Sequence, residues 1–385
     1  MSNLNLTLFV FYIILLTFVF FPLFYWNQSN MGLRIIERKS ILLDWRFWIP
    51  ALVYSILLGY RWDYAYDWNQ YYNTFNCIQH GELYRDTTEK GYLAVNYLLG
   101  YLGFSFYSIF ILEGFVYILS IFFLLKDNRR TIIFALPLIY MAARFNCLNI
   151  SRQFFAQSLL WIGFYYLLHE KKICFWVFSM LAFTIHTSAI VWIPIFYLMS
   201  YVKKMPNIWI MVSVYFACWI IRSLVQNYFI EGSNLITAYI ITNKEYDGIH
   251  IMEDKFLRND YEIGRIILLS VINLGYIFSS YFVFNRFKFK SQIEKLIVFV
   301  GIIGICLNVL GGTHEIFNRF FWYFSYLYYV GWGVVLFYLF MNRNMVPWYL
   351  WFVNLLGIAQ LLWSMYASIV DDVIRNHHFI QYKVF

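Results

Sequence analysis

Charged side chains are scarce in this chain of 385 residues. Only 13% of the residues are Asp, Glu, Lys or Arg, whereas 62% are hydrophobic. A soluble globular protein carries roughly 25% charged and about 45–50% apolar residues. The composition therefore excludes an ordinary soluble domain and is typical of an integral membrane protein.

Sequence motifs for nucleotides, metals and redox chemistry are also missing. The chain has no GxxxxGK[ST] loop, no GxGxxG turn and no HExxH pair. Its five cysteines form no CxxC pair: Cys77, Cys147, Cys174, Cys218 and Cys306. We therefore expect no cofactor and no metal, and an enzyme of this kind needs substrates that arrive already activated.

Long apolar segments recur along the chain, and a helix of about 20 apolar residues can cross a bilayer. These segments lie near residues 5–26, 47–60, 104–125, 131–146, 150–169, 173–187, 188–202, 207–229, 264–285, 291–311, 316–341 and 346–369. The first lacks the basic region and cleavage site of a secretory signal, so we expect it to be retained. The sequence predicts an all-α, polytopic membrane protein with about 11–12 transmembrane helices, forming one domain over residues 1–385.

The segments that connect these helices differ in charge. Under strict alternation, the short basic connections fall on one side: residues 34–46, 126–130, 170–172, 203–204, 286–295 and Arg343. The positive-inside rule assigns that side to the cytoplasm. Two larger loops, about 61–103 and 230–263, then lie outside. The net charge of +8 indicates contact with the lipid bilayer rather than with nucleic acid.

The first outer loop contains two helical patterns that are too short to span a membrane. In residues 63–80, apolar side chains recur at helical spacing: Tyr64, Trp68, Tyr71, Tyr72, Phe75 and Ile78. This stripe predicts a short helix in the membrane interface. Residues 91–102 predict a second, half-buried helix before the next span.

Several arginines lie at the outer ends of the expected spans or within them. Arg152 opens a helix directly after Ser151, a suitable N-cap residue. A helix N-terminus and a guanidinium group both favour an anion such as phosphate. The alternative is an arginine that extends its side chain to the lipid headgroups. Both interpretations also apply to Arg144, Arg222 and Arg319, and Arg265 is a further candidate. Arg258 lies in the second outer loop within a mixed charge run, for which the alternative is a solvated surface.

Acidic residues and histidines on the same side are candidate acids and bases. Asp63 and Asp67 share one helix face and could bind sugar hydroxyls or take a proton from one, as could Glu89. The alternative is that they stabilise a helix N-terminus. His186 and His250 are candidate bases. The alternative for His186 is a histidine that only satisfies the end of its helix. The remaining candidate substrate contacts are Tyr71, Gln153 and Glu315. Glu113, in the middle of a span, is expected to bond a neighbouring helix.

Five short motifs follow one another along the chain: DWNQY at 67–71, EKGY at 89–92, SRQFFA at 151–156, FTIHTS at 183–188 and EIFNR at 315–319. With these motifs the chain resembles the EpsG family of bacterial polysaccharide polymerases, within the wider Wzy-type group, over about residues 45–340. The resemblance implies a GT-C-like enzyme of the bacterial cytoplasmic membrane whose active face points outward. Such an enzyme lengthens a surface glycan (O-antigen, capsule or exopolysaccharide) on a polyprenyl diphosphate carrier.

The resemblance also implies partners and roles. The donor and the acceptor are polyprenyl-diphosphate-linked oligosaccharides, and a chain-length regulator is a possible partner. Arg152 and Arg319 take the arginine roles, His186 the histidine role, and Asp67 and Glu89 the acidic roles.

Three other functions remain open at this point. A flippase of lipid-linked oligosaccharide should have polar residues at the midplane and two related halves, which the sequence lacks. A glycan ligase is not distinguished from a polymerase by the sequence. An acyltransferase would need polar residues on the inner face or a path through the core, and the sequence shows neither.

Overall fold

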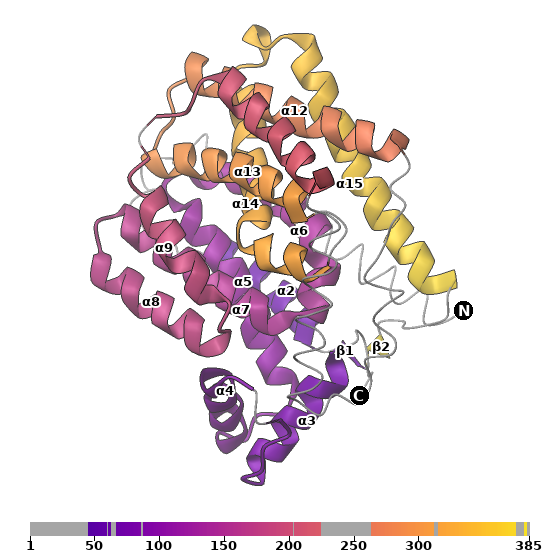
Figure 1. The fold of residues 1–385 in the computed structure, drawn as a ribbon. Coiled ribbons are helices and arrows are strands. Elements are labelled where there is room, and N and C mark those ends of the chain that lie inside the picture. The colour runs from indigo at the N-terminus through magenta and orange to yellow at the C-terminus, as the bar shows by residue number, and fades with distance from the viewer. Residues whose placement is uncertain are drawn as a thin grey trace. The chain divides into compact units, whose positions relative to one another are not determined.

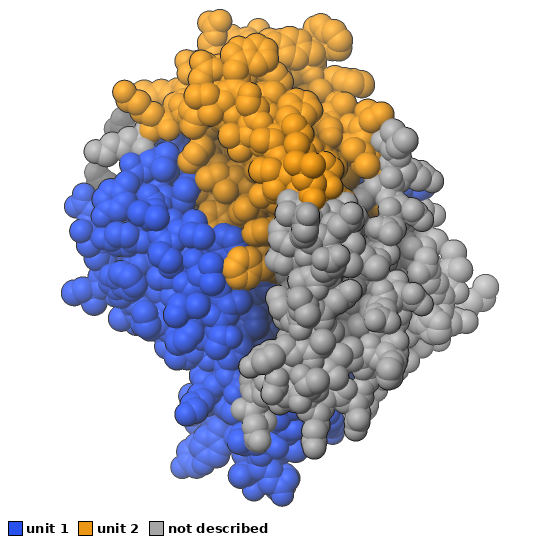
Figure 2. All heavy atoms as spheres, viewed as in Figure 1, with its two compact units in different colours: residues 1–202, 289–296, 358–385 blue, residues 203–288, 297–357 orange. Residues whose placement is uncertain are grey.

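The computed structural model describes residues 45–59, 61–62, 67–85, 88–202, 204–224, 263–311, 315–374 and 381–382. These residues are helical except for their turns and one antiparallel pair of two-residue strands, β1 (Arg61–Trp62) and β2 (Gln381–Tyr382) (Figure 1). The chain divides into two compact units, coloured separately in Figure 2. The expectation of one domain stays a prediction.

Unit 1 comprises residues 1–202, 289–296 and 358–385. Its helices, in chain order, are α2 (Trp45–Gly59), α3 (Trp68–Gln79), α4 (Lys90–Tyr101), α5 (Tyr107–Leu124), the 3-10 helix η2 (Lys126–Thr131), α6 (Ile132–Asn149), α7 (Ser151–Leu168), α8 (Lys172–Ile185) and α9 (Ala189–Met199). Helix α7 packs against both α5 and α8, and α2 packs on α5. Because α7 contacts helices on two sides, most of its side chains are buried.

Unit 2 comprises residues 203–288 and 297–357. Its elements are the helix Ile208–Leu224, α12 (Ile263–Arg286), most of α13 (Gln292–Gly311), α14 (Glu315–Met341), the 3-10 helix η4 (Arg343–Met345) and the first part of α15 (Trp348–Ile374). A buried polar network joins three of them. The Asn354 Oδ1 atom accepts from Trp332 Nε1 at 2.6 Å, and Asn354 Nδ2 donates to Ser279 Oγ at 2.8 Å. These bonds connect α12, α14 and α15.

Four helices in the described residues are long and apolar enough to cross a membrane: Tyr107–Leu124, Gly264–Arg286, Gln292–Gly311 and Arg319–Met341. Three shorter apolar helices accompany them, namely Lys172–Ile185, Ala189–Met199 and Ile208–Leu224. The all-α, polytopic fold class is thus confirmed. The total of 11–12 spans stays a prediction, and the segment 5–26 lies outside the described residues.

The part of the predicted 63–80 stripe that lies on α3 has three side chains facing protein, whereas Tyr64 lies outside the described residues. Trp68, Tyr71 and Phe75 are buried. Their rings contact Phe106 and Phe110 near the start of α5, with ring centroids 5.5 to 5.9 Å apart. These three side chains therefore dock α3 on the end of α5, whereas Tyr72 and Ile78 of the same stripe are half-buried. This docking places Tyr71 inside unit 1.

Helices α4 and α8 approach each other closely at Gly91. A Cβ atom at this position would lie 2.4 Å from Thr184 Oγ1 and 2.6 Å from the Thr184 carbonyl oxygen. No larger side chain fits there unless the backbones separate. Glycine thus allows the start of α4 to contact the last turn of α8, and this contact brings residues 89 and 186 together.

Candidate functional site

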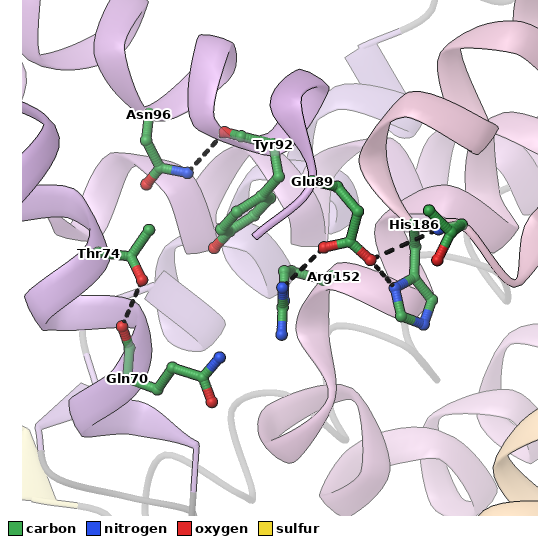
Figure 3. Close-up of polar contacts among 8 residues, drawn as sticks. Gln70, Thr74, Glu89, Tyr92, Asn96, Arg152 and His186 are labelled. Atoms are coloured by element: carbon green, nitrogen blue, oxygen red, sulfur yellow. Dashed lines mark hydrogen bonds and ion pairs between the residues drawn. The ribbon is translucent and has the colours of Figure 1, made fainter. Parts of the chain in front are cut away.

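Glu89 connects two other polar side chains at the ends of three helices (Figure 3). It occupies the N-cap position of α4 with extended backbone, yet its carboxylate does not cap that helix. One oxygen, Oε2, accepts from Arg152 Nη1 at 2.8 Å, and the other, Oε1, lies 2.7 Å from His186 Nδ1. The backbone N–H of Thr187 also points to Oε1, at 3.4 Å. A single carboxylate therefore contacts an arginine and a histidine.

Arg152 reaches Glu89 from the first turn of α7. Ile150, and not Ser151 as the sequence suggested, holds the N-cap position, and no side chain caps this helix. The guanidinium carbon lies 5.7 Å from the ring centroid of Tyr71 and 5.6 Å from that of Tyr92. Both rings are buried, so they fix the guanidinium by cation–π contact.

His186 follows α8 with an extended backbone, and its side chain is 26% exposed. A carboxylate can only accept hydrogen bonds, so the hydrogen of the contact with Glu89 belongs to His186 Nδ1. In the neutral imidazole the lone pair then lies on Nε2. Within the described residues Nε2 has no hydrogen-bond partner. The arrangement is that of an oriented histidine with one nitrogen available to accept a proton.

The environment keeps Glu89 ionised. Burial opposes its ionisation, but the hydrogen bond from His186 and the charges of Arg152 and His186 outweigh burial and lower the Glu89 pKa from 4.5 to about 2. Tyr71 shows the opposite effect, because burial and the nearby Asp67 charge raise its pKa to about 12. At neutral pH the carboxylate is therefore charged and the phenol is a neutral hydrogen-bond donor.

Two further acidic residues act on the tyrosines beside Arg152. Asp67 is the N-cap residue of α3, one turn before Tyr71, and its charge acts on that phenol. Glu113 is buried in α5, and its charge acts on both Tyr71 and Tyr92. The site thus combines side chains from α3, α4, α5, α7 and the end of α8.

The structure places the other predicted residues as follows. Gln153 is buried on α7 beside Arg152. Arg222, Arg265 and Arg319 belong to unit 2, and Arg222 lies over the Trp219 ring at 5.0 Å. Five predictions fall outside the described side chains: Asp63, Arg144, His250, Arg258 and Glu315. The roles assigned to all of these residues stay predictions.

Three members of the site were not among the predicted site residues: Tyr92, Glu113 and Thr187. Tyr92 could have been predicted from the sequence, because it follows Glu89 by three residues and so lies on the same side of α4. Glu113 was assigned to a helix contact, since a lone mid-span carboxylate gives no sign of its neighbours. Thr187 contributes only its backbone N–H, which the sequence does not reveal. No group of three or more metal-ligating side chains occurs in the described part of the chain.

Comparison with known proteins gives one match. A family model described as the EpsG family matches residues 44–384, which is most of the chain. No curated protein and no solved structure matches.

Proposed function

Because the chain belongs to the EpsG family, we propose that it is a polysaccharide polymerase, a membrane glycosyltransferase that joins polyprenyl-diphosphate-linked oligosaccharide units. The reaction takes place on the outer face of the bacterial cytoplasmic membrane. The single observation that carries the proposal is the contact of Glu89 with both His186 and Arg152. This arrangement supplies a base and a cation at one point, and glycosyl transfer from a diphosphate uses both.

His186 takes the proton of the acceptor sugar. The acceptor hydroxyl donates its hydrogen to Nε2 while its oxygen attacks the anomeric carbon of the donor. The bond between that carbon and the phosphate oxygen breaks, and polyprenyl diphosphate leaves. Glu89 keeps Nε2 pointed at the acceptor through Nδ1, and its charge stabilises the imidazolium that forms.

Arg152 acts on the leaving group. Its guanidinium has five N–H donors, and the bond to Glu89 occupies only one nitrogen. A second hydrogen bond goes to the Tyr71 side chain, and the donors that remain lie in the same plane, a geometry that suits phosphate oxygens. Negative charge grows on the diphosphate as it leaves, so a fixed guanidinium stabilises the transition state more than the bound substrate. The Tyr71 and Tyr92 rings hold the fork in place.

The position of the site favours transfer over transport. Glu89 precedes α4, Arg152 lies in the first turn of α7, and His186 follows α8. All three side chains thus come from helix ends, whereas a flippase binds its cargo near the bilayer midplane. This is the reason to prefer a polymerase over a transporter of the same lipid-linked glycan.

The test is polymerisation by purified protein in proteoliposomes that contain a polyprenyl-diphosphate-linked oligosaccharide. We expect wild-type protein to convert single units into longer glycan. His186→Gln removes the proton acceptor and should slow elongation by roughly a hundredfold or more. The matched control is His169→Gln, because His169 also contacts a carboxylate, Asp127 at 3.5 Å, at the other end of α7.

The same assay separates the rival functions. Movement of the substrate across the bilayer without any lengthening would indicate a flippase. Transfer of glycan to a terminal acceptor, with no polymer formed, would indicate a ligase. Full elongation by the His186→Gln variant would show that His186 is not the proton acceptor.

A further inference from the structure

Helix α4 and the turn after it expose a row of apolar side chains. Tyr97 and Leu98 are half exposed, Tyr101 is 76% exposed, and Leu102 and Phe104 continue the row. The rings of Tyr97 and Tyr101 stack on each other on the outer surface, with centroids 6.2 Å apart. A contiguous apolar surface of this kind marks an interaction site.

The segment that carries this surface has no charged residue. Residues 91–112 contain no Asp, Glu, Lys or Arg, although α4 is exposed along one side. A helix that faces water normally carries charged residues on its exposed side. The exposed side of α4 instead carries tyrosine and leucine, which suit the boundary between lipid headgroups and acyl chains.

Both ends of α4 are tied to the ends of apolar helices. Its first turn contacts Thr184 in the last turn of α8 through Gly91. After its last residue, Tyr101, only five residues precede α5, which is a candidate membrane span. The start of a span lies at the membrane boundary, so α4 must lie close to it. With 12 residues, α4 is about 18 Å long and too short to cross a hydrocarbon core of about 30 Å.

The helix on which α4 packs also has an exposed side that suits lipid. Helix α8, on which α4 packs, is an apolar helix that exposes five large apolar side chains between Lys172 at its start and Thr184 in its last turn: Ile173, Trp176, Val177, Met180 and Leu181. Figure 1 shows α4 at the lower end of α8, next to α3. Trp68, Tyr71 and Phe75 of α3 are covered by protein, so of the two short helices described between residues 67 and 101, α4 is the one with a row of exposed apolar side chains.

From these observations we infer that α4 and residues 102–104 lie in the headgroup layer of the membrane, with their exposed apolar side chains in lipid. The partner of this surface is the bilayer itself. Glu89 directly precedes α4, so this anchoring holds its carboxylate at the level of the lipid headgroups. The inference requires only that the chain crosses a membrane, and it stands whether or not the chain polymerises glycan.

The test is quenching of a fluorescent label by lipid. The full chain, with its five cysteines replaced by alanine, receives one cysteine at Leu98, Tyr101 or Glu82 and a nitrobenzoxadiazole label. It is then placed in bilayers whose lipids carry bromine near the top of the acyl chain. We expect quenching at positions 98 and 101 to exceed that at position 82, in the turn between α3 and α4, by at least threefold. Equal quenching at all three positions would overturn the inference.

A second measurement uses the unmodified chain, so its result does not depend on whether the cysteine variants fold. A lipid with a photoactivated carbene group in its headgroup region should label residues 97–104 and not residues 80–85. Absence of label from 97–104 overturns the inference. Energy transfer between labels on two copies at position 101, at low protein density, would assign the surface to a second copy of the chain instead.

Discussion

At the scale of single residues, Glu89 orients both of the other polar side chains of the site, Arg152 and His186. Its two oxygens contact different side chains, so removing its charge affects both. Glu89→Gln keeps the shape of the side chain but replaces one accepting oxygen with an amide nitrogen, which cannot accept a hydrogen bond from its partner. The His186 ring is then free to turn, and Arg152 loses the contact that orients it. A lost carboxylate of this type slows a histidine-dependent reaction by as much as about 10⁴-fold.

We therefore expect Glu89→Gln to reduce elongation in proteoliposomes by at least a hundredfold, at the level expected for loss of an oriented general base. The matched control is Asp127→Asn, which alters the carboxylate beside His169. If both variants retain the same rate, Glu89 is not part of the mechanism. Circular dichroism and gel filtration should show that both variants remain folded.

Arg152→Lys tests the second partner of Glu89. Lysine keeps the positive charge but loses the planar fork and the stacking on tyrosine. Loss of one such donor costs on the order of 3 kcal/mol, or roughly a hundredfold in rate. Arg343→Lys, at an arginine that lies over the Phe340 ring, is the control. Unchanged chain length in both variants would show that Arg152 does not bind the diphosphate.

The lowered Glu89 pKa predicts how stability depends on pH. The group titrates near pH 4.5 when unfolded and near pH 2 when folded. The contacts of the carboxylate thus stabilise the fold fully above about pH 4.5, and this contribution is lost as the pH falls through about 2. In detergent, the stability difference between wild type and Glu89→Gln should be constant from pH 6 to 8 and shrink below pH 4. A difference that grows on acidification would contradict the assignment.

At the scale of elements, the close approach of α4 to α8 assembles the site. Gly91→Ala adds a methyl group 2.6 Å from the Thr184 carbonyl oxygen, so the helices must separate. We expect this variant to lose elongation activity while its helical content stays unchanged. Gly264→Ala is the control, because an added Cβ atom meets nothing within 4 Å there. Full activity of Gly91→Ala would show that the two helices tolerate separation.

The positions of the helices were predictable, because the length and polarity of each segment determine where a span begins and ends. Helices α5, α12 and α13 agree with the predicted segments to within three residues. The start of α7 was predicted at Ser151 as N-cap, and the structure moves the cap to Ile150. Local capping preferences cannot resolve a difference of one residue, because packing along the rest of α7 sets its register.

What covers an apolar stripe was not predictable from periodicity. The spacing of Trp68, Tyr71 and Phe75 predicts a helix with one apolar side, but the same spacing fits lipid or protein. The structure shows Phe106 covering that side. Likewise, Glu89 and His186 were each candidates from the sequence, but their contact depends on Gly91 and Thr184, which are 93 positions apart in the chain.

At the scale of the whole chain, polar groups of unit 1 gather at both ends of α7. Arg152 and Glu89 lie at one end, and His169 and Asp127 at the other. The 17 positions from 152 to 169 correspond to about 26 Å of helix, close to the thickness of a hydrocarbon core. If the proposed function is right, we expect the two ends of α7 to lie near opposite membrane surfaces.

This separation predicts the outcome of thiol labelling in intact cells. In a cysteine-free background, a cysteine at exposed Thr187 should react with a membrane-impermeant reagent added outside. A cysteine at exposed Glu170 should react only after the membrane is opened. The reverse pattern would place Arg152 and His186 in the cytoplasm and contradict the proposed polymerase.

The short helices α8 and α9 have a consequence for the surrounding lipid. They contain 14 and 11 residues, and lengths of about 21 and 17 Å follow from the helical rise. Both are shorter than an average hydrocarbon core, so if they span the membrane we expect the bilayer beside them to thin locally and reduce the hydrophobic mismatch. Such thinning would draw the headgroups inward next to His186, so the proposed polyprenyl-diphosphate carrier would meet the protein where the membrane is thinnest.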